Sequence, residues 1–170
     1  YFVVEASGAS RAEQVVETLR NSLDSFAVLP LKGDRTPHTV MAGWLRHGDL
    51  PPRFNVEPDL ELKAPPDKAK GSIRYNRHPF DPRQVQALLA GGLLVTRLGL
   101  TWHDRVAFAL NDKLEFKRVE MLGVDADADD ADGGGDDAAD EAARFDADFA
   151  LMTGELAALL AEVDAAMGGR

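Results

Sequence analysis

The sequence Leu-Leu-Val-Thr-Arg-Leu-Gly-Leu-Thr-Trp, residues 93–102, begins the stretch that decides the fold. Two more segments rich in β-forming residues follow at 105–110 and 114–122, and Asn111-Asp112 between them is typical of a tight hairpin turn. Because alternate side chains of a strand point to opposite faces, Arg97 is expected on one face of the first strand. The apolar residues expected on the other face are Leu94, Leu98, Leu100 and Trp102. We predict a three-stranded meander with helices on its apolar face and solvent or a ligand on its polar face.

The first thirty residues predict a β-α-β unit. Phe2–Ala6 and Phe26–Leu31 have strand patterns, and the Ser10-x-x-Glu13 capping box between them predicts the start of a helix. A right-handed crossover would place the two strands parallel in one sheet. The first residues read as a strand already under way, with no initiator Met, so we expect that an N-terminal portion is missing.

The middle of the chain predicts two helices and two strands. Proline in the first turn, after a Thr or Asp cap, predicts helices over 36–48 and 81–92. Residues 54–62 alternate between apolar and polar, and Pro58 within them indicates an edge strand or a bulge. A further short strand is predicted at 72–77.

The C-terminal part predicts a linker followed by a long helix. Residues 125–140 are almost entirely Asp, Ala and Gly, which is typical of a self-repelling linker. A helix is predicted from about 143 to 167, with a heptad-like seam of Phe145, Phe149, Met152, Leu156, Leu159 and Val163. We therefore predict an α+β fold with a sheet domain at 1–122, an acidic disordered linker at 123–142 and a C-terminal helix at 143–170.

The net charge of −10 hides a basic middle. Residues 60–118 contain eleven Lys or Arg against six Asp or Glu, a net charge of +5. The net charge is −2 for residues 1–59 and −13 for residues 119–170. Local charge, rather than net charge, steers a polyanion. No apolar run approaches the roughly 20 residues that span a membrane, no signal peptide is visible, and the absence of cysteine excludes disulfides.

Several patterns associated with chemistry occur only in incomplete form. The acidic run from residue 125 starts like an EF-hand loop but lacks its glycine and its final glutamate. Residues 7–10 occupy the place of a phosphate loop, yet a turn and a helix cap explain them. The paired aspartates at 146 and 148 point to different helix faces, which makes them a poor acid/base pair. The four histidines, His38, His47, His78 and His103, each lie next to Pro, Arg or Asp in an expected surface turn, which does not favour a zinc site. We therefore expect no catalytic site, no metal and no cofactor, and a nuclease is the least favoured function because no folded segment has an acidic cluster for two metals.

The basic middle is the remaining candidate for function. Cations on one face of a sheet could follow phosphates without reading bases. The candidate DNA-binding residues are Lys70, Arg74, Arg77, Arg97, Arg105, Lys117 and Arg118, with Lys63 and Lys68 beside them. The alternative is a solubilising surface, because acids are interspersed. If the cations were scattered, or if each were paired with a neighbouring acid, the idea of phosphate contact would be refuted.

Residues 144–160, Arg-Phe-Asp-Ala-Asp-Phe-Ala-Leu-Met-Thr-Gly-Glu-Leu-Ala-Ala-Leu-Leu, closely resemble the C-terminus of the RdgC family of bacterial recombination-associated proteins. The stretch Val95–Phe108, followed by 114–122 with its Lys117-Arg118 pair, resembles the same family. Residues 28–31, Val-Leu-Pro-Leu, are similar to a stretch in the middle of family members. The resemblance covers most of the chain.

This resemblance implies a binding module without a reaction or a cofactor. Family members bind double-stranded DNA with little sequence preference, form ring-shaped homodimers and restrain the RecA recombinase, so a cytoplasmic, nucleoid-associated protein is expected. Arg97, Arg105, Lys117 and Arg118 match basic family positions. The sequence departs from the family in lacking its N-terminal half and in its extreme Asp/Gly linker.

The alternative is a protein-interaction or dimerisation module whose DNA contact is supplied by the missing half. The apolar seam at 145–163 motivates this hypothesis, although we favour packing of that seam against the domain's own sheet.

Overall fold

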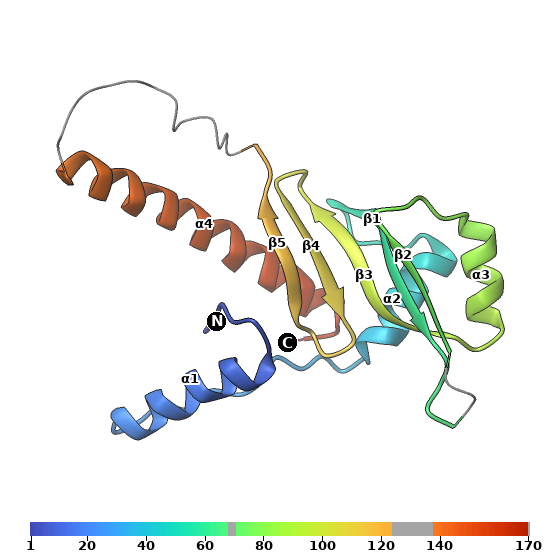
Figure 1. The fold of residues 1–170 in the computed structure, drawn as a ribbon, viewed down its shortest axis with the longest axis horizontal. Helices are drawn as coiled ribbons and strands as arrows, with labels where there is room; N and C mark the ends of the chain where they lie inside the picture. Colours follow the sequence, from blue (N-terminus) through green and yellow to red (C-terminus); the bar gives the residue numbers. More distant parts are fainter. Residues whose placement is uncertain (68–70, 124–137, 170) are drawn as a thin grey trace. The chain divides into compact units, whose positions relative to one another are not determined.

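The structure is a computed structural model that describes residues 1–67, 71–123 and 138–169, with side chains of the last stretch described from Glu141. Two compact units are present, residues 1–31 and residues 32–170, and each is described by itself. The first unit contains helix α1 (Ala9–Ser22). The second contains helices α2 (Pro37–His47), α3 (Pro82–Ala90) and α4 (Ala138–Ala166), and a five-stranded sheet (Figure 1).

The sheet is antiparallel throughout, in the order β2-β1-β3-β4-β5. Its strands are β1 (Phe54–Lys63), β2 (Ser72–Asn76), β3 (Leu94–Trp102), β4 (Val106–Asn111) and β5 (Phe116–Met121). The α+β class and the β3-β4-β5 meander are thereby confirmed. The turn between β4 and β5 is longer than the predicted hairpin, because Asn111 Oδ1 accepts hydrogen bonds from the backbone N–H groups of Lys113 and Glu115.

The hydrophobic core lies between the helices and one face of the sheet. Leu98, Leu100 and Trp102 face it, as their spacing predicts, but the prediction is wrong for Leu94, which is half-buried, pairs with Lys63 and is replaced in the core by Val95. The helices contribute Val40, Met41 and Trp44 from α2, Val85 and Leu89 from α3, and Leu159 and Val163 from α4. Full burial of each large apolar side chain contributes about 1.5–3 kcal/mol. Because Leu159 and Val163 of α4 belong to this core, the C-terminal half of the predicted seam packs against the domain's own sheet.

Bulges interrupt the ladder between β1 and β3. The register shifts between Val56 and Leu60, so Pro58 lies in a bulge, as one of the two alternatives predicted. The edge-strand alternative is wrong, because β1 has β2 on one side and β3 on the other. A second shift at Glu61/Leu62 makes Thr96 the extra residue of β3, so that Val95 reaches the core while Thr96 lies on the polar face beside Arg97.

The predicted β-α-β unit is wrong. Helix α1 forms, but residues 2–6 and 26–31 are in no strand. Two short parallel segments are too few to form a stable sheet, since such pairs need further strands and two covered faces. The helix also starts earlier than the capping box indicates: its N-cap is Gly8, without a side-chain cap hydrogen bond.

The ends of the other predicted helices are largely correct. Asp81 caps α3 by accepting a hydrogen bond from the backbone N–H of Arg83 (2.9 Å), and α2 ends at Gly48 in the left-handed conformation. Helix α4 begins at Ala138, before the predicted start. Most of the predicted linker at 123–142 lies outside the described residues, so the proposed domain boundaries stay a prediction. No helix in the described stretches is long and apolar enough to cross a membrane.

Candidate nucleic-acid interface

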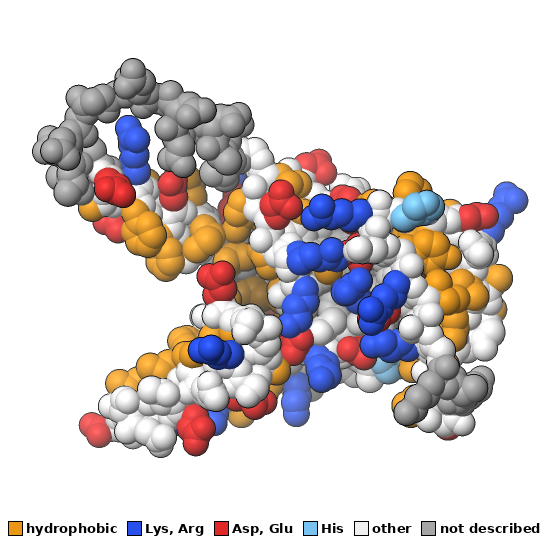
Figure 2. Space-filling model, viewed as in Figure 1, with side chains coloured by type: hydrophobic (Ala, Val, Ile, Leu, Met, Phe, Trp, Pro, Cys, Tyr) orange, Lys and Arg blue, Asp and Glu red, His pale blue; other side chains and the backbone are white. Residues whose placement is uncertain are grey.

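The sheet face opposite the core carries a group of basic side chains. Strand alternation and register bring together five cations from four strands, and Figure 2 shows Lys and Arg side chains gathered over the sheet. We call this group the basic face: Lys63, Arg74, Arg97, Lys117 and Arg118. Four of the five are predicted site residues, and Lys63 was placed beside them.

Asp59 is the centre of the basic face. Its Oδ1 accepts hydrogen bonds from Arg97 on β3, with Arg97 Nη2 at 3.0 Å, and its Oδ2 is paired with Arg118 on β5. One buried carboxylate thus joins two guanidinium groups that come from opposite sides of β4.

Glu61 organises the β1–β2 side of the same face. Its carboxylate is paired with Arg74 and with Lys63 (3.4 Å), and it accepts a hydrogen bond from Thr96 Oγ1 (3.1 Å). Burial raises the pKa of Glu61, but the hydrogen bond from Arg74 and the charge of Lys63 outweigh burial and hold the pKa below its usual value of 4.5. The carboxylate is therefore stabilised in its charged form.

Lys117 is paired with Glu115 at the start of β5 (2.9 Å). The hydrogen bonds from Lys117 and from Asn111 lower the pKa of Glu115 below its usual value. Two further acids lie on this face: Glu57 accepts a hydrogen bond from Thr101, and Glu120 of β5 is the register partner of Ala107. Neither has an ion pair with a residue that the structure describes. Cations and carboxylates are therefore close to balanced in number here.

The arginines of the basic face and the two carboxylates with which they pair lie at different depths below the surface. The side chains of Arg74, Arg118 and Arg97 are 62%, 45% and 26% exposed, whereas those of Asp59 and Glu61 are 8% and 7% exposed. The acids lie beneath and the cations above them. An arginine has five N–H donors, so pairing with a buried acid leaves donors that can point outward. Around Asp59 and Glu61, the accessible layer of this face is therefore positive although the total charge of the face is small.

The remaining predicted residues are not part of this face. Arg105 is the last residue of the β3–β4 turn and is paired with Glu155 of α4 (2.7 Å). Arg77 lies just beyond β2, is exposed, and has no ion pair with any residue that the structure describes. Lys70 and Lys68 lie outside the described residues.

Of the six predicted site residues that are described, five are paired with an acid. Pairing of each cation with a neighbouring acid was the criterion for refuting phosphate contact, and Arg77 is the one described site residue that does not meet it. That criterion assumed that pairing hides the charge, whereas on the basic face the acids are the deeper partners. The role of these residues in DNA binding stays a prediction. Sequence reasoning missed Asp59 and Glu61, although the polar residues at every second position from 57 to 63 were a signal for them.

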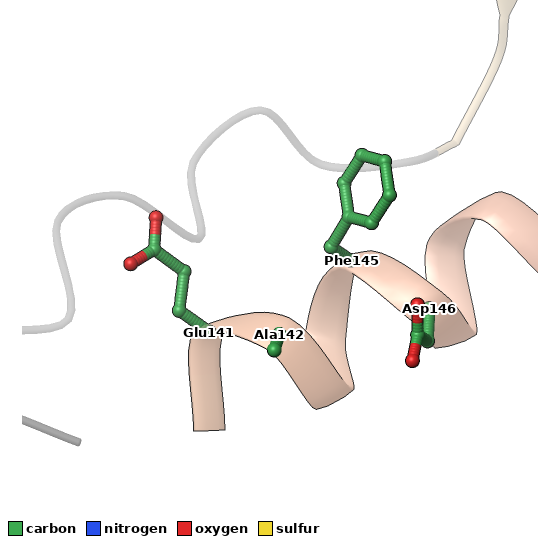
Figure 3. Close-up of a pocket in the computed structure, with 4 residues that line it drawn as sticks. All are labelled: Glu141, Ala142, Phe145 and Asp146. Carbon is green, nitrogen blue, oxygen red and sulfur yellow. The ribbon is translucent and has the colours of Figure 1, made fainter. Parts of the chain in front are cut away.

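Metal sites and surface hollows are the other features of the described residues that bear on catalysis. No group of three or more His, Cys, Asp or Glu among them could hold a metal ion. Figure 3 shows a surface hollow on the first turns of α4, lined by Glu141, Ala142, Phe145 and Asp146. All four are exposed, and the two carboxylates point in different directions. This hollow has no converging polar groups.

The N-terminal half of α4 exposes an apolar stripe. Phe145 is 67% exposed and stacks on Phe149, with ring centroids 6.0 Å apart, and Leu151 and Met152 are exposed beside them. The stripe continues the seam whose C-terminal half is buried in the core.

Comparison with known proteins gives consistent matches along the chain. The family model described as "RdgC: Putative exonuclease, RdgC" matches residues 1–170. A "Recombination-associated protein RdgC" of Dechloromonas aromatica is 42% identical over 172 residues, which cover 99% of this chain and 55% of that protein. Proteins of the same name from Cupriavidus pinatubonensis and Bordetella parapertussis are 37% and 36% identical over 169 residues, 99% of this chain and 54% of theirs. The chain spans about half the length of these relatives.

Proposed function

The chain belongs to the RdgC family, and from that premise we propose that its basic face contacts the sugar–phosphate backbone of double-stranded DNA without reading base sequence. The observation that carries this proposal is the layering of exposed cations over buried carboxylates. The names of its relatives, recombination-associated proteins, support a role that involves DNA.

The chemistry of the basic face favours backbone contact over base readout. Phosphate contacts position a protein on DNA, and base-edge contacts in the grooves provide specificity. The five cations are side chains of strands in one sheet face, a surface that can lie along a duplex. Because each of the five is already paired with an acid, less side-chain entropy is lost on binding. The family resemblance further supports a dimeric ring that encloses the duplex and restrains the RecA recombinase.

The experiment measures duplex binding by the full-length protein across a salt series. For each phosphate contact, the slope of log affinity against log salt is about −0.9. Arg97→Gln, Lys117→Gln and Arg118→Gln are each expected to reduce the magnitude of this slope by about 1 and to weaken binding equally for unrelated sequences. Glutamine retains a donor for the acid beneath, so the fold is disturbed less than with alanine.

Arg83→Gln is the matched control, because Arg83 is exposed on α3, the helix that packs on the apolar side of the sheet. It is expected to bind as the unmodified protein does. A shallow slope, a strong sequence preference, or unchanged binding by all three sheet variants would refute backbone contact by this face. Release of nucleotides from linear duplex in the presence of Mg²⁺ or Mn²⁺ would show that the protein acts as a nuclease.

Self-association is the second candidate function, and the exposed stripe of α4 favours it. Exposed aromatic and apolar side chains in one patch are typical of an interface. Removing the whole helix would also remove core residues such as Leu159, so point changes are the better test. Phe145→Ser with Phe149→Ser is expected to lower the mass in solution from dimer to monomer, as measured by analytical ultracentrifugation. An unchanged mass would exclude this stripe as the interface.

A further inference from the structure

We propose that Asp59 is a positioning residue, which holds Arg97 and Arg118 together as one two-guanidinium site for a single backbone phosphate. This inference rests on the proposed contact with DNA, and it assigns the strongest phosphate position on the basic face. Asp59 itself would not touch the DNA.

The geometry of the three side chains supports a shared site. Each oxygen of the Asp59 carboxylate serves a different arginine, Oδ1 for Arg97 and Oδ2 for Arg118. Two guanidinium groups around one carboxylate leave a net charge of +1 and several N–H donors unused. Because Asp59 is 8% exposed and both arginines are more exposed, the unused donors lie on the solvent side. A phosphate, with several acceptor oxygens, is the ligand that such a pair of guanidinium groups suits.

The fold is built to bring these groups together across the sheet. Arg118 is on β5, Asp59 is on β1, and strands β3 and β4 lie between them. Arg118 lies where the register of β5 shifts against β4, and its φ of 53° is in the left-handed region. The paired residues Gly99 of β3 and Ala109 of β4 lie between on the polar face, and both have small side chains. The path from Arg118 to Asp59 is therefore clear.

Gly99 of the neighbouring strand β3 fixes the position of Asp59 by its close contact with it. A Cβ at Gly99 would lie 2.8 Å from Asp59 Cβ and 3.2 Å from the Asp59 carbonyl oxygen. The bulged segment of β1 thus lies directly on the backbone of β3. This close approach buries the carboxylate and sets the height at which both arginines are held.

General electrostatic attraction and side-chain positioning predict opposite effects of losing the Asp59 carboxylate on binding to DNA. Asp59→Asn raises the net charge by one, so general attraction alone would strengthen binding to a polyanion. If Asp59 positions the arginines, its loss lets two long side chains move and repel each other. Binding would then weaken by about tenfold, because ordering two such side chains on binding costs roughly that factor.

The experiment compares Asp59→Asn with Glu57→Gln in full-length protein, using a labelled duplex and fluorescence anisotropy over a salt series. Glu57 lies on the same strand and face, but its described partner is Thr101 rather than a cation. Both variants lose one negative charge. We expect Glu57→Gln to bind equally or more tightly, and Asp59→Asn to bind about tenfold more weakly, with the magnitude of the slope reduced by about 1, as for the loss of one phosphate contact.

A double-mutant cycle separates positioning from a general loss of structure. In the Arg97→Gln/Arg118→Gln background, Asp59→Asn is expected to have no further weakening effect. Equal weakening in both backgrounds, or tighter binding by Asp59→Asn alone, would overturn the positioning role while the DNA contact stands. Absence of duplex binding by the unmodified protein would overturn both proposals.

If Asp59→Asn does not fold, NMR of the unmodified protein provides the same test. The side-chain Nε–H signals of Arg97 and Arg118 are expected to shift together in one titration with duplex. A shift of only one of the two would overturn the shared site.

Discussion

Gly99→Ala perturbs the bulge at which β1 lies close against its neighbour β3 and is expected to destabilise the fold. The added Cβ would lie 2.8 Å from Asp59 Cβ, 3.1 Å from Glu57 Cβ and 3.2 Å from the Asp59 carbonyl oxygen. Carbon atoms pack best at about 3.5–4.0 Å. All three atoms are attached to or part of the β1 backbone, so the strand itself would have to move.

Added volume at a well-packed site that cannot adjust costs about 1–3 kcal/mol. For a domain of this size that corresponds to a fall in Tm of roughly 2–12 °C. The assay is urea unfolding followed by circular dichroism, with a thermal scan as a second measurement. Tryptophan fluorescence supplies an independent probe, because Trp102 lies at the end of the same strand.

The matched control is Gly154→Ala in α4, where an added Cβ would meet no atom within 4 Å. Alanine is a better helix former, so this variant is expected to gain about 0.5–1 kcal/mol. The reasoning is refuted if the free energy of unfolding of Gly99→Ala is within about 0.5 kcal/mol of that of the unmodified protein, which is the range of a neutral surface change. It is refuted equally if both alanine variants change stability in the same direction.

The remaining predictions concern charge, the core and α4. The pKa of Glu61 is lowered in the folded protein, so Glu61 contributes stability at pH values above its usual pKa of 4.5, and this contribution is lost as the pH falls below that value. Glu61→Gln should therefore reduce the fall of Tm in acid, and an unchanged fall of Tm would contradict the ion-pair assignment. Leu159→Ala removes a fully buried side chain and should cost about 2–5 kcal/mol in urea unfolding; a cost below that of a surface change would mean that α4 is not docked. Phe149→Ser, at an exposed position, should change unfolding free energy by no more than about 0.5 kcal/mol, and a larger loss in the monomer would place Phe149 in a core. Arg35 donates to the carbonyl of Ala166 at the C-terminal end of α4, so Arg35→Ala should speed hydrogen exchange in the last turn of the helix, whereas unchanged exchange would show that this contact is dispensable.

Local pattern was a reliable guide where a single strand or helix decides which residues are buried. The meander was predictable because Leu98, Leu100 and Trp102 alternate with polar residues, and the alternation needs no knowledge of the partner strand. The proline within β1 likewise indicated its bulge. The seam of α4 was predicted, but the pattern could not tell which half would be buried, because the sheet reaches only residues such as Leu159 and Val163.

The N-terminal unit shows where local pattern fails. Residues 2–6 and 26–31 have strand composition, yet neither forms a strand among the described residues. A strand exists only with a hydrogen-bonding neighbour, and neighbours are a property of the whole fold. The capping box failed for a related reason: the helix begins at Ala9 after Gly8, so Ser10 is inside it.

By itself, the sequence determined the class of the fold, the faces of the C-terminal half of β3, the apolar stripe of α4 and the concentration of positive charge in the middle of the chain. Tertiary structure alone decided which acid meets which cation, and at what depth. Asp59 meets Arg97 and Arg118 because two register shifts and a glycine contact set the distance between three strands. Such distances depend on pairing between remote segments, which residue spacing along one chain does not encode.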